Sequence, residues 1–190
     1  MNPITFLYKK INLRKNKKRF ASFGKNSCIG IPLRINGANR IYIGDNVSIH
    51  YLTWLACIPL TGVSGGGKLI IEDGCVIGDF NHIFSTFEIV LRKNVLTANH
   101  VYISDNQHCY EDINTPIVKQ PIKQLSKVEI GEGSWIGENV CIMGCSIGKG
   151  CVIGANSVVT HDIPDYCIAV GAPAKIIKKY DFDTKIWIKV

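Results

Sequence analysis

Residues 130–159 divide into the units IGEGSW, IGENVC, IMGCS, IGKGCV, IGANSV and a final V. An aliphatic residue opens every unit and a glycine usually follows it, so the pattern repeats every six residues, with one unit a residue short. A period of six matches neither an amphipathic helix, at 3.6, nor an alternating strand, at 2. It predicts a coil with three short flat faces, whose aliphatic openers point inward and whose Gly-Asx and Gly-Glu pairs form tight corners, often with positive φ.

The same period extends toward the N-terminus. Stacked coils of this kind pair as parallel strands about 4.8 Å apart, and each coil is stable only when its neighbours cover it. The sequence therefore predicts an all-β protein, a parallel β-helix. The earlier openers are Ile31, Gly37, Ile43, Ile49, Ile71, Ile77, Ile83, Leu91, Thr97 and Ile103.

Breaks in the period mark the irregular segments. One break contains Ser64-Gly65-Gly66-Gly67, which we interpret as a surface loop. The longest contains the polar, proline-bearing residues 106–127, which we interpret as a functional loop because long loops on a regular scaffold commonly bind ligands. We expect a basic capping segment at 1–27, the β-helix at 28–175, and a C-terminal cap of short helix or strand at 176–190.

Composition indicates a single globular domain. The chain has 190 residues, of which 46% are hydrophobic and only 19% charged, and this excludes intrinsic disorder. No apolar run approaches the roughly 18 residues of a membrane span, and the N-terminal apolar patch is too short for a signal peptide, so we expect a cytoplasmic protein. The eight cysteines contain no C-x-x-C pair, and we expect most of them to be reduced, small buried hydrophobic residues.

A basic cluster lies within residues 9–19. It could be a solvated face, a contact for nucleic acid, or a contact for the anionic inner membrane surface. No aromatic-basic module and no Cys/His finger accompanies it, so we expect no sequence-specific nucleic-acid binding, and membrane contact remains a weaker alternative.

His108 is the best catalytic candidate among the five histidines, because it stands where the repeat stops and the long loop begins. A neutral imidazole near pH 7 suits a general base. Asp105 lies three residues earlier and could orient the imidazole, although Glu111 and Asp112 are alternatives.

Two segments carry a family resemblance. Residues 105–112, followed by Ser134-Trp135-Ile136-Gly137, and residues 154–164, followed by 170–177, resemble the left-handed β-helix acyltransferases. The closest similarity is to maltose and galactoside O-acetyltransferases and to capsule or O-antigen O-acetyltransferases. This resemblance, and not the periodicity, implies a left-handed coil. It also implies direct acetyl transfer from acetyl-CoA to a sugar hydroxyl in surface polysaccharide synthesis, with His108 as base, in a homotrimer with active sites between subunits.

The resemblance also assigns further site residues. It places Trp135 along the acetyl-CoA groove and a backbone N–H of Gly137-Glu138 against the oxyanion. His161 replaces a lysine that the family usually has near the CoA phosphates. Asn81 and His82 are expected near the acceptor. The remaining residues expected to bind acetyl-CoA are Ala155, Thr160 and Lys175.

Three rival functions remain. Within the transferases, an amino acceptor such as an aminosugar, an amino acid or an antibiotic is the alternative to a hydroxyl. A γ-type carbonic anhydrase shares the fold but holds zinc with three histidines, two of them closely spaced, and that pair is missing here, so we expect no metal. A non-catalytic β-helix scaffold would bind no CoA.

Overall fold

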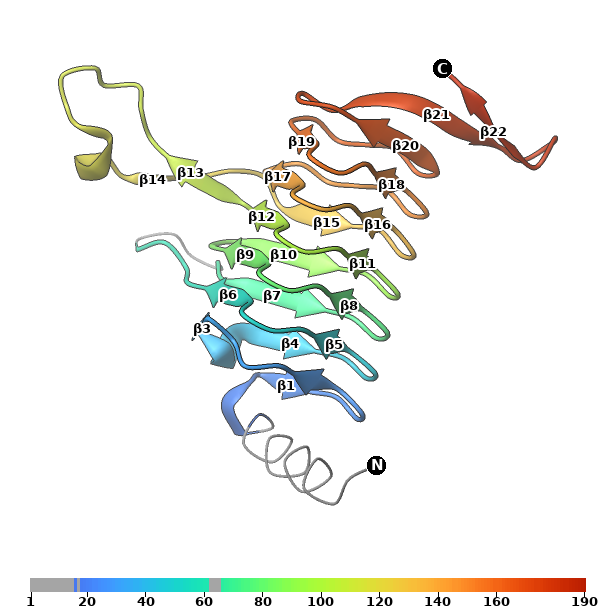
Figure 1. Ribbon diagram of the computed structural model, residues 1–190. Helices are drawn as coiled ribbons and strands as arrows, with labels where there is room; N and C mark the ends of the chain where they lie inside the picture. Colours follow the sequence, from blue (N-terminus) through green and yellow to red (C-terminus); the bar gives the residue numbers. More distant parts are fainter. Residues whose placement is uncertain (1–15, 17, 62–65) are drawn as a thin grey trace.

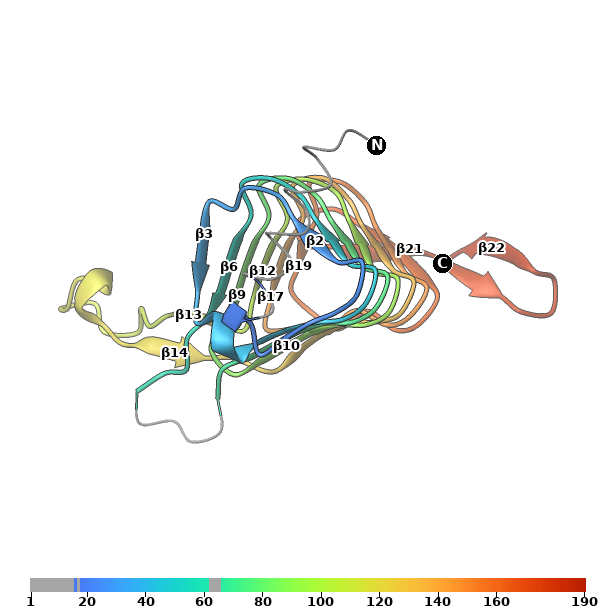
Figure 2. The same ribbon diagram turned by 90° about the horizontal axis from the view of Figure 1, so that it is seen from below.

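The computed structural model describes residues 16, 18–61 and 66–190, which form a triangular prism of stacked coils (Figure 1). Three parallel sheets form its faces, and the chain visits them in the order A, B, C in each coil. Seen from the N-terminal end, the path turns anticlockwise while it recedes from the viewer (Figure 2), so the coil is left-handed. The predicted all-β, left-handed parallel β-helix is confirmed.

Each sheet collects one strand from each successive coil. Sheet A contains β1 (Ser22–Phe23), β4 (Ile41–Ile43), β7 (Lys68–Ile71), β10 (Glu88–Leu91) and β15 (Val128–Ile130). Sheet B contains β2 (Cys28–Ile29), β5 (Ser48–Ile49), β8 (Val76–Ile77), β11 (Leu96–Thr97), β16 (Trp135–Ile136), β18 (Val152–Ile153) and β20 (Cys167–Val170), continued by β21 (Lys175–Asp181) and β22 (Ile186–Lys189). Sheet C contains β3 (Arg34–Asn36), β6 (Trp54–Cys57), β9 (His82–Ser85), β12 (Tyr102–Ser104), β17 (Cys141–Met143) and β19 (Val158–Val159).

The predicted openers Ile83, Ile103 and Ile142 form a column inside the prism, which Leu55, a residue in a break of the period, extends by one coil. On sheet C, Leu55 pairs with Ile83, Ile83 with Ile103, and Ile103 with Ile142. All four side chains are completely buried. Each coil thus covers the apolar face of the coil below it, and this mutual burial is the main stabilisation of a solenoid.

Two predicted openers are wrong. Ile31 is 61% exposed because it lies at the corner after β2: Ile29, two residues earlier, pairs with the buried Ile49, and Tyr51, at the position of Ile31 in the next coil, is also exposed. Gly37 precedes the 3-10 helix η1 (Ala38–Arg40) with a φ of 64°, so it forms a corner instead of an inward column.

Cysteines replace larger aliphatic residues along the core. Cys57, Cys75, Cys145, Cys151 and Cys167 are buried, which confirms the interpretation of most cysteines as small apolar residues. Burial raises the pKa of the Cys57 and Cys75 thiols to about 11, so both remain protonated at neutral pH.

The two ends of the prism are closed differently. Phe20 and Phe23 cover the N-terminal end, and the first strand begins at Ser22, inside the segment predicted to precede the coils. The rest of the basic segment lies almost entirely outside the described residues. At the C-terminal end, β21 and β22 form an antiparallel hairpin that extends sheet B away from the prism (Figure 2). Among the described residues, no helix has the length and apolar character needed to cross a bilayer.

Both long interruptions leave the prism where the chain passes from sheet C to sheet A, which we call the C–A corner (Figure 2). The first follows β6, and its residues 62–65 lie outside the described ranges. The second is the predicted loop 106–127, which contains the strands β13 (Asn106–His108) and β14 (Ile122–Gln124) and the 3-10 helix η2 (Ile117–Lys119).

Candidate active site

His108 lies at the C–A corner on the loop 106–127, which projects from the prism and which we call the arm. It ends β13 opposite Ile122 of β14, and its side chain is exposed. The antiparallel pairing of β13 with β14 fixes the backbone on both sides of the arm, so the imidazole is presented from a defined strand. An exposed imidazole on a regular strand can exchange protons with a bound hydroxyl.

Asp105 lies at the root of the arm and is completely buried. Its Oδ1 accepts hydrogen bonds from the Thr86 backbone N–H at 2.7 Å and the Thr86 hydroxyl at 2.9 Å. Its Oδ2 accepts from the Phe87 N–H at 2.8 Å and the Ser85 hydroxyl at 3.1 Å. These donors belong to the C–A corner of the coil below, so the carboxylate anchors the arm to the prism. The prediction that Asp105 orients the His108 imidazole is therefore corrected, because both carboxylate oxygens accept hydrogen bonds from residues 85–87 instead.

The other two acidic candidates are also engaged elsewhere. Glu111 forms an ion pair with Lys123 at 2.9 Å across the arm, and this contact lowers the pKa of the Glu111 carboxyl to about 2. Asp112 accepts a hydrogen bond from the Asn114 N–H at 2.9 Å in the adjoining turn. Among the described residues, no carboxylate is hydrogen-bonded to His108.

A pocket opens on the C-terminal side of the arm. We call it the Thr160 pocket, and its volume is about 630 Å³. Gln107 of β13 and Gln124 of β14 form one wall, while Met143 and Thr160 from the two following coils form the other. Of the residues predicted to bind acetyl-CoA, Thr160 lines this pocket. The neighbouring His161 contacts Thr160, with 2.9 Å between Nδ1 and Oγ1, and Lys175 opens β21 with an exposed side chain.

The remaining predicted site residues lie toward the opposite edge of sheet C, where the chain passes from sheet B to sheet C. They are Asn81, His82, Trp135, Gly137, Glu138 and Ala155. At this B–C corner each coil caps the coil below it. The Tyr51 N–H donates to Asp79 Oδ1 at 2.8 Å, and the Asp79 N–H donates to Asn99 Oδ1 at 2.8 Å. The Asn99 N–H donates to Glu138 Oε2 at 3.0 Å.

This series of side-chain caps stops at Glu138. Trp135-Ile136 pairs in register with Val152-Ile153, so Ala155 occupies the capping position above Glu138, and alanine has no acceptor. Within the described part of the chain the Glu138 N–H has no hydrogen-bond partner. The Gly137 N–H, by contrast, donates to the Ile153 carbonyl at 2.8 Å, so of the two predicted oxyanion donors only Glu138 is available. Trp135 is 49% exposed beside this corner.

Asn81 and His82, predicted to contact the acceptor, do not reach solvent freely. Asn81 is 1% exposed; its amide donates to Thr97 Oγ1 at 2.6 Å and its carbonyl accepts from the Val101 N–H at 2.6 Å. It is a structural corner residue, which corrects the prediction of an acceptor contact.

His82 lies on the outer face of sheet C. Its ring stacks on Trp54 with centroids 4.0 Å apart and an interplanar angle of 6°, and it tilts against Tyr102 at 5.1 Å. Nε2 of His82 is buried without a hydrogen-bond partner, and burial lowers the pKa of the imidazole. The structure therefore places His82 in an aromatic column, away from the arm that carries His108.

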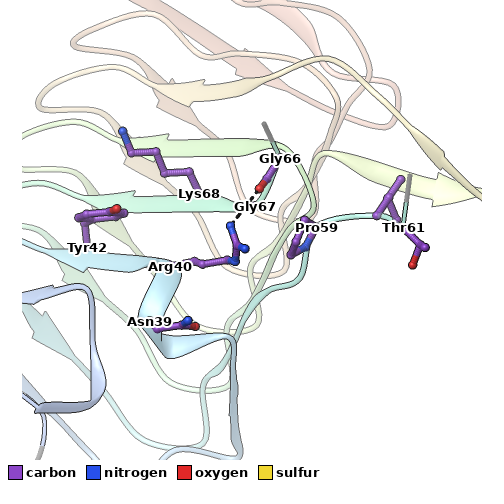
Figure 3. A pocket seen from close by; sticks show the side chains of 9 residues that line it. Asn39, Arg40, Tyr42, Pro59, Thr61, Gly66, Gly67 and Lys68 are labelled. Atoms are coloured by element: carbon purple, nitrogen blue, oxygen red, sulfur yellow. Dashed lines mark hydrogen bonds between the residues drawn. The ribbon is translucent and has the colours of Figure 1, made fainter. Parts of the chain in front are cut away.

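A second pocket was missed by sequence reasoning. It lies at the C–A corner on the N-terminal side of the arm, with a volume of about 660 Å³, and we call it the Arg40 pocket (Figure 3). Its described lining comes from three short segments, 39–42, 59–61 and 66–68, on two successive coils. Because these segments come together only in the folded chain, no sequence motif indicates the pocket. The lining residues are Asn39, Arg40, Tyr42, Pro59, Leu60, Thr61, Gly66, Gly67 and Lys68.

No group of three or more His, Cys, Asp or Glu side chains within the described ranges is arranged to hold a metal ion. The candidate residues thus fall into two groups: His108 and the Thr160 pocket at one edge of sheet C, and the open Glu138 N–H at the other edge.

Comparison with known proteins identifies the family. The family model described as bacterial transferase hexapeptide (six repeats) matches residues 127–161. A putative lipopolysaccharide biosynthesis O-acetyl transferase of Escherichia coli, WbbJ, is 38% identical over 132 residues, which cover 66% of this chain and 67% of the relative. A probable acetyltransferase of Mycobacterium tuberculosis is 39% identical over 149 residues, covering 73% of this chain but only 49% of the relative.

Solved structures share the fold. AntD, an N-acyltransferase from Bacillus cereus crystallised with dTDP and 3-hydroxybutyryl-CoA, superposes with a TM-score of 0.72 at 23% identity, covering 90% of this chain and 89% of AntD. A hexapeptide-repeat acetyltransferase from Vibrio cholerae, complexed with acetyl-CoA, gives a TM-score of 0.56 at 23% identity over 87% of this chain and 74% of that one. The repeat match and the relatives together show that this chain belongs to the hexapeptide-repeat acetyltransferases.

Proposed function

We propose that this protein is an acetyl-CoA-dependent O-acetyltransferase that acetylates a sugar hydroxyl in the synthesis of a surface polysaccharide, in the cytoplasm. The observation that carries the proposal is the position of His108, exposed on the arm between two pockets of the same corner. The similarity to the lipopolysaccharide biosynthesis O-acetyl transferase of Escherichia coli supports a hydroxyl acceptor on a lipopolysaccharide component.

In this proposal His108 moves the proton. The imidazole accepts the proton of the acceptor hydroxyl as the oxygen attacks the thioester carbonyl, and it returns that proton to the sulfur that leaves. Direct transfer needs no covalent intermediate on the protein. The Thr160 pocket, which lies directly beside β13, would hold the arm of the donor that carries the thioester.

The Glu138 N–H is the donor for the charge that develops on the carbonyl oxygen. A backbone N–H held at a rigid corner needs no reorganisation when that charge forms, which is the condition for effective oxyanion stabilisation. Ala155, the residue one coil above, has no side-chain oxygen that could accept a hydrogen bond, and this leaves the Glu138 N–H available in each copy of the chain.

His108 and the Glu138 N–H lie at opposite edges of sheet C within one chain. Strands β12 and β17 have three residues each, so the edges are about 10 Å apart at 3.3 Å per residue. If three copies face a common axis with sheet C, the C–A corner of one copy lies beside the B–C corner of the next. We therefore propose a homotrimer whose active sites each use two chains.

The outer face of sheet C supports this arrangement. It carries the column Trp54, His82 and Tyr102 together with Phe84 and Met143, in strands whose outward positions elsewhere are polar or small. A flat aromatic face of this kind is typical of a surface that a second copy covers. The buried, unpartnered Nε2 of His82 would also lie at that contact.

The alternative within the family is transfer to an amine. AntD is an N-acyltransferase crystallised with a dTDP-aminosugar, which favours an aminosugar as the second candidate acceptor. A hydroxyl and an amine differ in their need for a base, because an amine attacks only when it is already neutral. Activity toward either acceptor can be compared once donor binding is established.

The first experiment does not depend on the acceptor. Acetyl-CoA is titrated into the purified protein by calorimetry, and we expect saturable binding near one molecule per chain. Absence of binding up to millimolar acetyl-CoA would exclude the proposed donor and leave a different acyl donor or a non-catalytic scaffold.

A further inference from the structure

The Arg40 pocket is lined by two cationic side chains and no acidic one among its described residues. Arg40 ends η1 and its guanidinium donates a long hydrogen bond of 3.4 Å to the Gly66 carbonyl (Figure 3). Lys68 begins β7, and its ammonium lies 5.3 Å from the centre of the Tyr42 ring. Both side chains are exposed; the Arg40 guanidinium points toward Gly66, and the Lys68 ammonium extends along the rim on the side of Tyr42 (Figure 3).

The nearest carboxylate in register does not neutralise this charge. Glu88 pairs with Lys68 across β7 and β10, but its carboxylate binds the Lys127 ammonium at 2.6 Å. Neither Arg40 nor Lys68 takes part in a salt bridge within the described residues. The side chains of Asn39 and Thr61 and the phenol of Tyr42 add neutral hydrogen-bonding groups around the pocket (Figure 3). Two unneutralised cations with polar neighbours favour an anion with several oxygens.

The position of the pocket relates it to the proposed reaction. Along the C–A corner, the order from the N-terminal end is the Arg40 pocket, the arm with His108, and the Thr160 pocket. The arm emerges two coils above β6 and β7, a rise of about 10 Å at 4.8 Å per coil. His108 lies three residues beyond Asp105 along the arm, so a sugar with its hydroxyl at His108 would extend a phosphate or diphosphate at its anomeric end toward the Arg40 pocket.

We infer that the Arg40 pocket binds the phosphate or diphosphate of a glycosyl phosphate acceptor. The inference rests on the proposed function, since it specifies the class of acceptor for that same site. A volume of about 660 Å³ is large enough for a diphosphate and part of the group that it links to the sugar. That group is either a nucleoside or a lipid, and both present the same diphosphate to Arg40 and Lys68.

The test uses three probes on the intact protein: inorganic pyrophosphate, UDP and geranyl diphosphate, each titrated by calorimetry in the presence of saturating acetyl-CoA. The doubly substituted Arg40→Ala/Lys68→Ala protein is expected to lose about tenfold or more in affinity for every probe that the wild type binds, because two charge-assisted contacts are removed. Lys25→Ala/Lys189→Ala removes two exposed charges elsewhere, one after β1 and one at the end of β22, and is expected to leave these affinities unchanged.

The outcomes separate the inference from the function on which it rests. Tighter binding of UDP than of geranyl diphosphate indicates a nucleotide-linked acceptor, and the reverse order indicates a lipid-linked one. Wild-type protein that binds acetyl-CoA but none of the probes, or a double variant with undiminished probe affinity, overturns the inference alone. Loss of acetyl-CoA affinity in the double variant also overturns it, because the pocket would then hold the phosphates of the donor. Wild-type protein that binds no acetyl-CoA contradicts the proposed function itself.

Discussion

Ala155 lies one coil above Glu138 at the B–C corner and offers no hydrogen-bond acceptor to the Glu138 backbone N–H. In the coils below, Asp79, Asn99 and Glu138 occupy the equivalent position, and each accepts a hydrogen bond from the N–H beneath it. Because Ala155 supplies only a methyl group, the run of capped N–H groups from Tyr51 to Asn99 ends at Glu138. An uncapped N–H in a regular stack is a weak point for stability, since an acceptor there would add a hydrogen bond.

We predict that Ala155→Asn lowers acetyl transfer by about 10²–10³ while keeping or raising thermal stability. The new amide oxygen would accept from the Glu138 N–H, as Asn99 accepts from Asp79, and would withdraw the donor from the oxyanion. Steady-state rates and the melting temperature measure the two effects.

Ala155→Leu is the matched control, because leucine has nearly the size of asparagine but no acceptor. We expect Ala155→Leu to retain clearly more activity than Ala155→Asn. Equal losses in the two variants would mean that bulk at this corner, and not the capped N–H, blocks the reaction.

A second prediction concerns the base. His108→Ala should lower turnover by about 10²–10⁴, with unchanged acetyl-CoA affinity and an unchanged unfolding transition, because the side chain is exposed and has no structural partner among the described residues. His50→Ala, which removes an exposed histidine at the B–C corner, serves as the control. Wild-type turnover in His108→Ala would remove this residue from the mechanism.

A third prediction follows from the buried carboxylate of Asp105. In Asp105→Asn the amide nitrogen must face donors that now bind a carboxylate oxygen, so at least one buried donor loses its acceptor. We expect a loss of about 1–3 kcal/mol in the free energy of unfolding and faster proteolysis within residues 106–127. Glu111→Gln, which alters an exposed carboxylate on the same arm, should change neither quantity measurably. An Asp105→Asn protein as stable and protease-resistant as wild type would contradict the anchoring role.

The fold could be predicted because its period is local. Between the breaks, the aliphatic openers from Ile43 onward repeat at a spacing of six with one unit a residue short, and burial follows them at Ile77, Ile103 and Ile153. Handedness could not be derived from periodicity, since an inward opener is equally compatible with a coil of either hand. Ile31 shows the other limit: the six-residue count assigns the inward position to Ile31, whereas in the structure Ile29 aligns with Ile49 and Ile31 lies at the corner.

The site was predictable only in part, for a related reason. His108 could be located because the repeat ends there, but the partners of Asp105 lie some twenty residues earlier, on another coil, and no local pattern connects them. The Arg40 pocket joins segments whose residues become neighbours only after the coils stack. Conversely, the family resemblance suggested Asn81 as an acceptor contact, although its amide nitrogen and its carbonyl oxygen both form hydrogen bonds inside the coil.

A fourth prediction concerns pH. Burial lowers the pKa of His82 in the folded protein below its ordinary value near 6.5, so the unfolded chain binds this proton first as the pH falls. Folding stability should therefore decrease as the pH falls below about 6.5. His82→Phe keeps an aromatic ring against Trp54 and removes the titration, so its stability advantage over wild type should grow from pH 7 to pH 5. Urea unfolding at pH 7, 6 and 5, at one fixed protein concentration, measures this difference. A difference independent of pH would show that His82 is not protonated selectively in the unfolded chain.

The last prediction tests whether each site uses two chains. His108→Ala lacks the base but keeps the Glu138 N–H open, and Ala155→Asn has the opposite defect. The two inactive proteins are dissociated reversibly, mixed and reassembled. A site between two chains is then intact when an Ala155→Asn chain supplies the arm with His108 and a His108→Ala chain supplies the B–C corner with the open Glu138 N–H. With equal amounts and random assembly, each condition is met half of the time, so roughly a quarter of wild-type activity should return. Mixing two preparations of the same variant is the control and should restore nothing. If both halves of the site belonged to one chain, the mixed sample would also remain inactive, because no chain in it carries both the base and the open N–H.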